Sequence, residues 1–150
     1  MLNKKIYELL SSKKGVTLIE ILISLIIFII IIVPFLGMFV QSTKSNSLSQ
    51  NIIDATYIAQ SCMEDVYSIS ITNNFMDGLT ELKDNGFTET VVVADEDYDY
   101  TKNIDGYYAL IEIRKSAYSG NLVKVVAKIY NNSALEKLEA QMETILLWNS

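Results

Sequence analysis

Glu20 is the charged side chain whose position in this sequence most needs a chemical explanation. It is the only charged residue between positions 16 and 40, and 19 of the 23 residues at positions 18–40 are apolar. A carboxylate in such a segment costs up to a few kcal/mol near the centre of a membrane, and it usually marks function. A simple membrane anchor gains nothing from this carboxylate, although an acid tolerated near the lipid headgroups is the alternative explanation.

The remaining reactive residues exclude several kinds of catalysis. The sequence has no histidine and one cysteine, which excludes Ser-His-Asp and Cys-His catalysis, histidine-bound zinc and an intrachain disulfide. The alternating acids Asp95, Asp97 and Asp99 resemble the start of a calcium loop, but Tyr100 and Gly106 replace the glycine and glutamate of an EF-hand. We therefore expect a solvated acidic loop and no cofactor, with calcium at these three aspartates as the weaker alternative. Because no catalytic constellation is present, we expect no enzyme activity.

Charge divides the chain into three parts. Residues 1–15 carry four lysines and one glutamate, whereas residues 41–150 carry eight basic and sixteen acidic residues. Between them, residues 21–40 form an apolar segment that would span roughly 30 Å as a helix, the thickness of bilayer hydrocarbon. The basic side of such a segment stays in the cytoplasm, so the acidic part is expected outside. An acidic part also argues against direct binding of nucleic acid, whose phosphates require Lys and Arg.

Residues 13–20 carry a motif of high specificity. The segment Lys-Lys-Gly-Val-Thr-Leu-Ile-Glu combines basic residues, a glycine, an apolar residue and a glutamate five positions after the glycine, directly before the long apolar segment. It resembles the class III signal of the type IV prepilin superfamily, which includes the pseudopilins of type II secretion. The resemblance covers about residues 11–70 well and the rest of the chain only in outline.

The resemblance implies how the chain is processed and assembled. A membrane prepilin peptidase would recognise Lys13, Lys14, Gly15 and Glu20, and it would cut between Gly15 and Val16. Val16 would become the N-methylated first residue of the mature chain. In the family's assembly model, Glu20 of an incoming subunit pairs with the Val16 amine of the preceding one and fixes the axial register. Thr17 is expected to start the helix without a separate role.

Two residues depart from the common family pattern. The family often has Phe as its first mature residue and a proline near the twenty-second, whereas this chain has Val16 first and Pro34 as the nineteenth. Proline removes one helical hydrogen bond, so with Gly37 it predicts a kink or local melting around residues 30–37 in a filament. We expect Pro34 to act in filament assembly with Val16 and Glu20. Its shifted position favours a minor or pseudopilin-like subunit.

The expected fold is α+β and pilin-like, with a long N-terminal helix packed on an antiparallel sheet of about four strands. The expected parts are a leader (1–15), the apolar half of the helix (16–40), its amphipathic half (41–72) and a β-sheet head (73–150). An apolar stripe at helical spacing predicts the packed face of the amphipathic half, with Cys62 as a small core residue. Residues 75–87 are expected to be irregular. Strands are expected at 88–94, 107–115 and 122–130. Residues 135–148 suit either a helix or a strand, and the resemblance implies a strand.

Three functions remain open: the resemblance implies the first two, and the apolar segment alone allows the third. The first is a structural, minor subunit of a type IV pilus or pilus-like filament, held in the cytoplasmic membrane and then displayed at the cell surface. Its partners would be other pilin subunits, the prepilin peptidase and an assembly platform. The second is a pseudopilin of a type II secretion or competence DNA-uptake system, which shares the leader and the helix. The third is a signal-anchored extracytoplasmic protein, which gives Glu20 no role.

Overall fold

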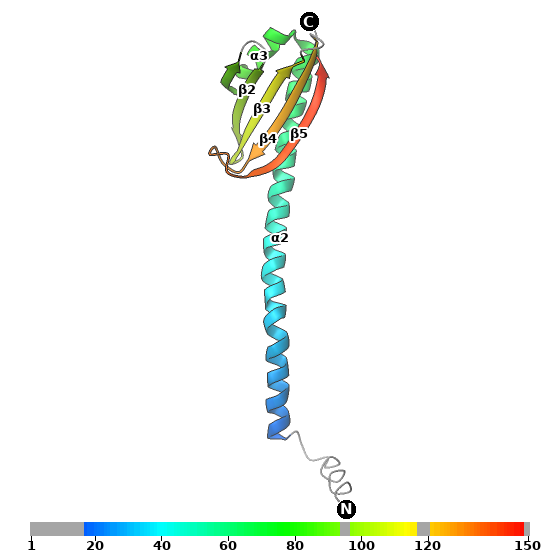
Figure 1. Cartoon of the computed structure of the whole chain (residues 1–150), viewed down its shortest axis with the longest axis vertical. Coiled ribbons are helices and arrows are strands. Elements are labelled where there is room, and N and C mark those ends of the chain that lie inside the picture. Colours follow the sequence, from blue (N-terminus) through cyan, green and yellow to red (C-terminus); the bar gives the residue numbers. More distant parts are fainter. Residues whose placement is uncertain (1–16, 94–96, 117–120, 149–150) are drawn as a thin grey trace, which may run out of the picture. The chain divides into compact units, whose positions relative to one another are not determined.

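The described part of the protein contains a long helix, a short helix and one antiparallel sheet, so the expected α+β fold is confirmed (Figure 1). The computed structural model describes residues 17–93, 97–116 and 121–148. The chain divides into two compact units between Ser45 and Asn46, and each is described by itself. The elements are α2 (Leu18–Thr72), α3 (Phe75–Asp84), β1 (Thr88–Val93), β2 (Asp97–Ile104), β3 (Tyr107–Lys115), β4 (Leu122–Tyr130) and β5 (Leu138–Leu147).

In the first unit, α2 carries apolar side chains around its whole circumference. Residues 18–40 are exposed except for the partly covered Ile32. A helix that is apolar on every side needs an apolar environment from outside the chain. This part of α2 is long and apolar enough to cross a membrane. The helix continues through Pro34 and Gly37, and the kink expected in an assembled filament stays a prediction.

The sheet contains five strands in the order β1-β2-β3-β4-β5, one more than the sequence predicted. All neighbouring strands are antiparallel. The additional strand is β2, which occupies most of the segment expected to be a solvated acidic loop. Tyr98 and Tyr100 alternate with its acids and are 5% and 0% exposed, so their burial offsets the poor strand propensity of aspartate.

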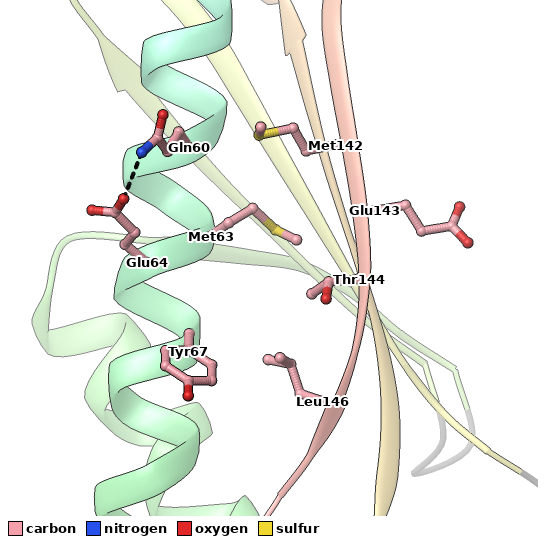
Figure 2. Close-up of a pocket in the computed structure, with 8 residues that line it drawn as sticks. All are labelled: Gln60, Met63, Glu64, Tyr67, Met142, Glu143, Thr144 and Leu146. Carbon is pink, nitrogen blue, oxygen red and sulfur yellow. Dashed lines mark hydrogen bonds between the residues drawn. The ribbon is translucent and has the colours of Figure 1, made fainter.

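The C-terminal segment forms the strand β5, as expected, at one edge of the sheet. Figure 2 shows Met142, Thr144 and Leu146 pointing from β5 toward α2, whereas Glu143 points away. This alternation settles the ambiguity of the sequence, because only a strand places every second residue on the same face.

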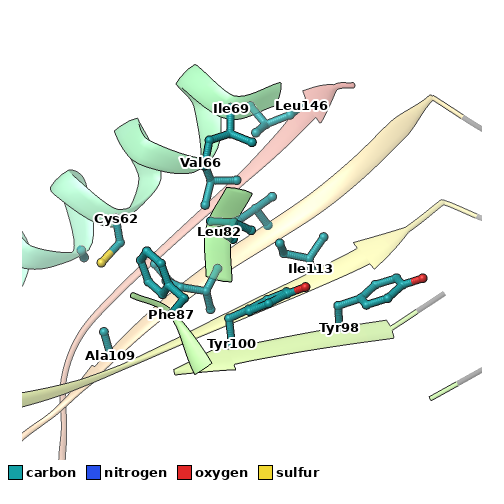
Figure 3. Close-up of a cluster of buried hydrophobic side chains, with 14 of the residues drawn as sticks. Cys62, Val66, Ile69, Leu82, Phe87, Tyr98, Tyr100, Ala109, Ile113 and Leu146 are labelled. Carbon is teal, nitrogen blue, oxygen red and sulfur yellow. The ribbon is translucent and has the colours of Figure 1, made fainter. Parts of the chain in front are cut away.

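The core lies between the C-terminal part of α2 and the inner face of the sheet (Figure 3). The predicted stripe is buried from Ala55 onward, whereas Leu48 and Ile52 are 47% and 44% exposed. Cys62 is 1% exposed and is a core residue, as expected. The largest fully buried side chains of the sheet and the C-terminus are Tyr100, Ile111, Ile113, Ile129 and Trp148.

Helix α3 replaces the irregular stretch expected between residues 75 and 87. The Asn74 side chain caps it by accepting a hydrogen bond of 3.0 Å from the backbone N–H of Asp77. Leu79 and Leu82, on the side of α3 that faces the core, are buried. Gly86 follows the helix with a φ of 86°, a left-handed conformation that glycine adopts readily. Gly78 does not break the helix, and it lies against the ring of Trp148.

Candidate functional site

Glu20 lies in the first turn of α2, where Thr17 precedes the helix. Its backbone N–H donates to the Thr17 carbonyl at 3.0 Å and lies 3.4 Å from the Thr17 hydroxyl. Thr17 and Glu20 have the spacing of a capping box, so Thr17 starts the helix as expected. A carboxylate at this end is also favoured by the helix dipole, by about 0.3–1 kcal/mol at an exposed site. This position at the start of the helix is thus an alternative explanation for Glu20 that the sequence analysis did not give.

The Glu20 carboxylate has no hydrogen-bond or ion-pair partner within the described part of the chain. Two side chains bond to the backbone of this residue: the Thr17 hydroxyl accepts from its N–H at 3.4 Å, and the Ser24 hydroxyl donates to its carbonyl at 2.6 Å. All three residues are exposed. The carboxylate is therefore available to a cation from another molecule, while the residue's own backbone N–H and C=O are already bonded.

The other residues predicted for processing and assembly have different outcomes. Lys13, Lys14, Gly15 and Val16 lie outside the described residues. Pro34 is on the same helix as Glu20 but 14 positions away, which is roughly 21 Å along the helix axis. Glu20 and Pro34 therefore do not form a single site, and any role of Pro34 in assembly is separate from the carboxylate.

The alternating acids Asp97 and Asp99 lie on the outer face of the sheet rather than in a solvated loop. Arg114 of β3 contacts both of them, with N–O distances of 3.4 Å to Asp97 and 2.6 Å to Asp99. The same guanidinium donates to the Tyr98 carbonyl at 3.1 Å. Arg114 thus supplies the positive charge that a calcium ion would supply at these two carboxylates. Asp95 lies outside the described residues, and those described contain no group of three or more metal-binding side chains.

The pairing of Arg114 with these acids was not identified from the sequence. It depends on the register between β2 and β3, in which Asp97 stands opposite Arg114 and Asp99 opposite Glu112. The arginine is 17 positions after Asp97, so their proximity follows from strand pairing. The signal that could have found it is the alternation of tyrosine and aspartate at positions 97–100, which is typical of a half-buried strand.

A groove between α2 and β5 was also absent from the sequence analysis. It has a volume of about 310 Å³ and lies within the second unit (Figure 2). Met63 and Tyr67 of α2 line it together with Met142 and Leu146 of β5. Glu64 adds a carboxylate, which accepts a hydrogen bond of 2.8 Å from the Gln60 amide. The groove is mainly apolar, so it suits apolar side chains better than a charged small molecule.

Burial perturbs two titratable side chains of the core. It raises the pKa of the Cys62 thiol to about 11, with a smaller contribution from nearby Asp65. It also raises the pKa of Tyr100 to about 12, and Glu89 adds to that shift. The Tyr100 hydroxyl donates to the Leu79 carbonyl at 3.4 Å and so joins the sheet to α3. Both groups stay protonated at neutral pH, which fits packing rather than acid–base chemistry.

No family model matches this chain, and searches of curated proteins and of solved structures find no significant match. The assignment of function therefore depends on the residue pattern around Glu20 and on the geometry described above.

Proposed function

We propose that this protein is a structural subunit of a type IV pilus or a pilus-like filament, cleaved after Gly15 and assembled through its N-terminal helix. The observation that carries the proposal is the Glu20 carboxylate. Among the described residues it has no partner, and it lies in the first turn of a helix whose following apolar side chains are exposed apart from the partly covered Ile32. A neighbouring subunit would supply both the missing cation and the missing apolar contacts.

Cleavage after Gly15 would create that cation. The new amino group of Val16 would lie four residues before Glu20, at the same end of the apolar segment. Two opposite charges brought together among apolar helices attract each other strongly, whereas a single buried charge left without its partner costs about 3–5 kcal/mol. Only one axial arrangement of neighbouring helices satisfies both charges, so the pair would set the register of the filament.

The fold supports the same proposal. The first part of α2 contributes no side chain to the core, while its last part packs on a five-stranded antiparallel sheet. This division suits a subunit that polymerises through one part of its helix and displays a folded head on the other. A signal-anchored protein would need the apolar segment, but it would have no use for the unpaired carboxylate.

The capping role of Glu20 is the competing explanation, and substitutions separate the two. Glutamine serves in a capping box as glutamate does, but it carries no charge. Because Lys13, Lys14 and Gly15 remain for the peptidase, Glu20→Gln and Glu20→Ala should both still be cleaved and methylated at Val16 yet fail to enter filaments. Ser24→Ala is the matched control, because it removes a neighbouring polar group of the same helix and should assemble normally.

Mass spectrometry of sheared surface filaments and of the membrane fraction provides the measurement. The proposal expects a peptide beginning at methylated Val16 in filaments of the wild type and of Ser24→Ala. For Glu20→Gln it expects that peptide in the membrane fraction only. Normal incorporation of Glu20→Gln would show that capping alone explains the residue. Recovery of only the intact chain beginning at Met1 would contradict the filament function itself.

A further inference from the structure

The outer edge of β5 offers backbone hydrogen bonds that no described residue uses. In an antiparallel pair, alternate residues direct their N–H and C=O groups toward the partner strand. The backbone N–H of Trp148 donates to the Asn121 carbonyl at 2.8 Å, and the register continues unbroken to Ile129 opposite Ala140. Even-numbered residues of β5 therefore bond to β4. The residues whose backbone groups face the free edge are Gln141, Glu143, Ile145 and Leu147.

The two edges of the sheet differ in how well they resist pairing with another chain. Edge strands are normally protected from pairing with another chain by being short, by containing a bulge or by carrying charged side chains. β1 has six residues and an irregularity between Glu89 and Val91. β5 has ten residues, and Ile145 and Leu147 are 64% and 69% exposed on it. β5 also has an irregularity, at residue 139, but from Ala140 to Leu147 its register is unbroken, so this part of the edge is longer and more regular than β1.

The groove lies directly beside this edge. A strand added next to β5 would place every second side chain on the inner face of the sheet, level with Met142 and Leu146. On that face the groove offers the partly buried Met63 and the exposed ring of Tyr67 (Figure 2). The edge would supply backbone hydrogen bonds and the groove would select apolar side chains at alternate positions.

Charge identifies the kind of chain that fits. Glu64 lines the groove and has no cationic partner among the described residues. Each lysine and arginine at positions 46–150 already contacts a group of the same unit. Lys44 lies inside α2 and so cannot belong to an extended strand. A second copy of this head therefore has no spare cation to offer, whereas a different chain with a lysine or arginine complements the groove.

We infer that β5 and its groove bind an extended segment of a partner protein by strand addition. The segment carries apolar side chains at alternate positions and a basic side chain that pairs with Glu64. This binding is additional to polymerisation through the N-terminal helix and does not depend on it.

The first test removes one edge hydrogen bond. The full chain in detergent micelles is titrated against a fluorophore-labelled synthetic peptide of nine residues, with lysine at both ends, valine at positions three, five and seven and threonine at the positions between, so that lysines and valines share one face of the strand. Ile145→Pro loses the N–H that faces the free edge and leaves the bonds to β4 intact, while Ile145→Ala loses the same side chain but keeps the N–H. We expect Ile145→Pro to bind about tenfold more weakly than Ile145→Ala. Circular dichroism checks that both variants remain folded.

Two further arms test the geometry and the charge. Two versions of the peptide are N-methylated along one edge or along the other. Because only one edge of the bound peptide faces β5, one version should bind and the other should not. Glu64→Gln should weaken binding about two- to fivefold, whereas Asp65→Asn, on the neighbouring exposed position outside the groove, should not.

Several results would overturn the inference. These are an absence of saturable binding by any version of the peptide, equal binding by the Ile145→Pro and Ile145→Ala chains, and equal binding of the two methylated peptides. Self-association of the full chain that Ile145→Pro abolishes would assign the edge to a second copy instead. None of these results bears on cleavage after Gly15 or on the role of Glu20.

Discussion

Replacement of Gly78 by alanine tests how closely α3 approaches the core. A Cβ at this position would lie 2.7 Å from Cζ2 of Trp148 and 2.9 Å from Cγ2 of Ile69. Carbon atoms prefer separations of about 3.5–4.0 Å. The indole cannot easily move away, because Trp148 is 2% exposed and packs edge-on against Phe75 with ring centroids 5.1 Å apart.

Two opposing effects set the magnitude. Alanine in place of glycine inside a helix favours folding by about 1 kcal/mol. Adding a methyl group to a filled core typically costs about 1–3 kcal/mol. Because both contacts of Gly78 are shorter than 3.0 Å, we expect the upper part of that range. Gly78→Ala should therefore lower the free energy of unfolding by about 1–2 kcal/mol.

Urea unfolding of the full chain in detergent micelles measures this change. Trp148 is the only tryptophan of the chain, so its fluorescence reports on the unit that contains α3. Thr80→Ala, at an exposed position of the same helix, is the control and should change stability by less than about 0.5 kcal/mol.

A second substitution shows whether the indole causes the loss. Trp148→Phe removes the ring atoms that Cβ would meet. It forfeits no hydrogen bond, since the indole N–H has no partner among the described residues. Followed by circular dichroism, Gly78→Ala should cost about 1 kcal/mol less in the Trp148→Phe background. A Gly78→Ala chain as stable as the wild type would refute the close packing of α3 on Trp148.

Two further predictions concern charge. Arg114→Ala should lower the free energy of unfolding in urea by about 1–3 kcal/mol, because it leaves a buried oxygen of Asp99 without its counter-charge. Lys124→Ala, which breaks a half-exposed ion pair, should lower it by less than about 0.5 kcal/mol. Equal losses in the two variants would contradict this ranking. The folded chain raises the pKa of Cys62 from 9.0 to about 11, so it binds this proton more tightly than the unfolded chain. This tighter binding contributes fully to stability below pH 9. As the pH rises toward 11 the contribution is lost, and the free energy of unfolding falls by about 2 kcal/mol. Cys62→Ala should lack this part of the pH dependence.

The sequence predicted the elements whose burial pattern matched their local composition. β3 and β4 have the expected bounds, and the packed face of α2 follows the apolar stripe from Ala55 onward. The errors occurred where composition opposed burial. The aspartates of β2 suggested a loop, although Tyr98 and Tyr100 of the same strand are buried. Gly78 suggested an irregular chain in place of α3, although the space beside Trp148 has room only for a glycine.

The site residues show a different limit. Glu20 could be identified because its environment in the chain is local, namely an apolar segment and a motif of eight positions. The groove could not, because Met63 and Met142 are 79 positions apart and meet only once β5 lies beside α2. The pairing of Arg114 with Asp99 likewise depends on strand register, which alternation alone does not specify.

The order of the strands has a consequence for how the sheet assembles. Every strand pairs only with its neighbours along the chain, from β1 to β5. With this connectivity, only short loops have to close when the strands pair during folding. The entropic cost of each pairing is therefore small, and folding is expected to be fast for a β-rich unit. As the chain is synthesised from its N-terminus, each new strand can pair with the one before it without waiting for a distant partner. β5 would then join last, and its arrival would complete both the core and the groove.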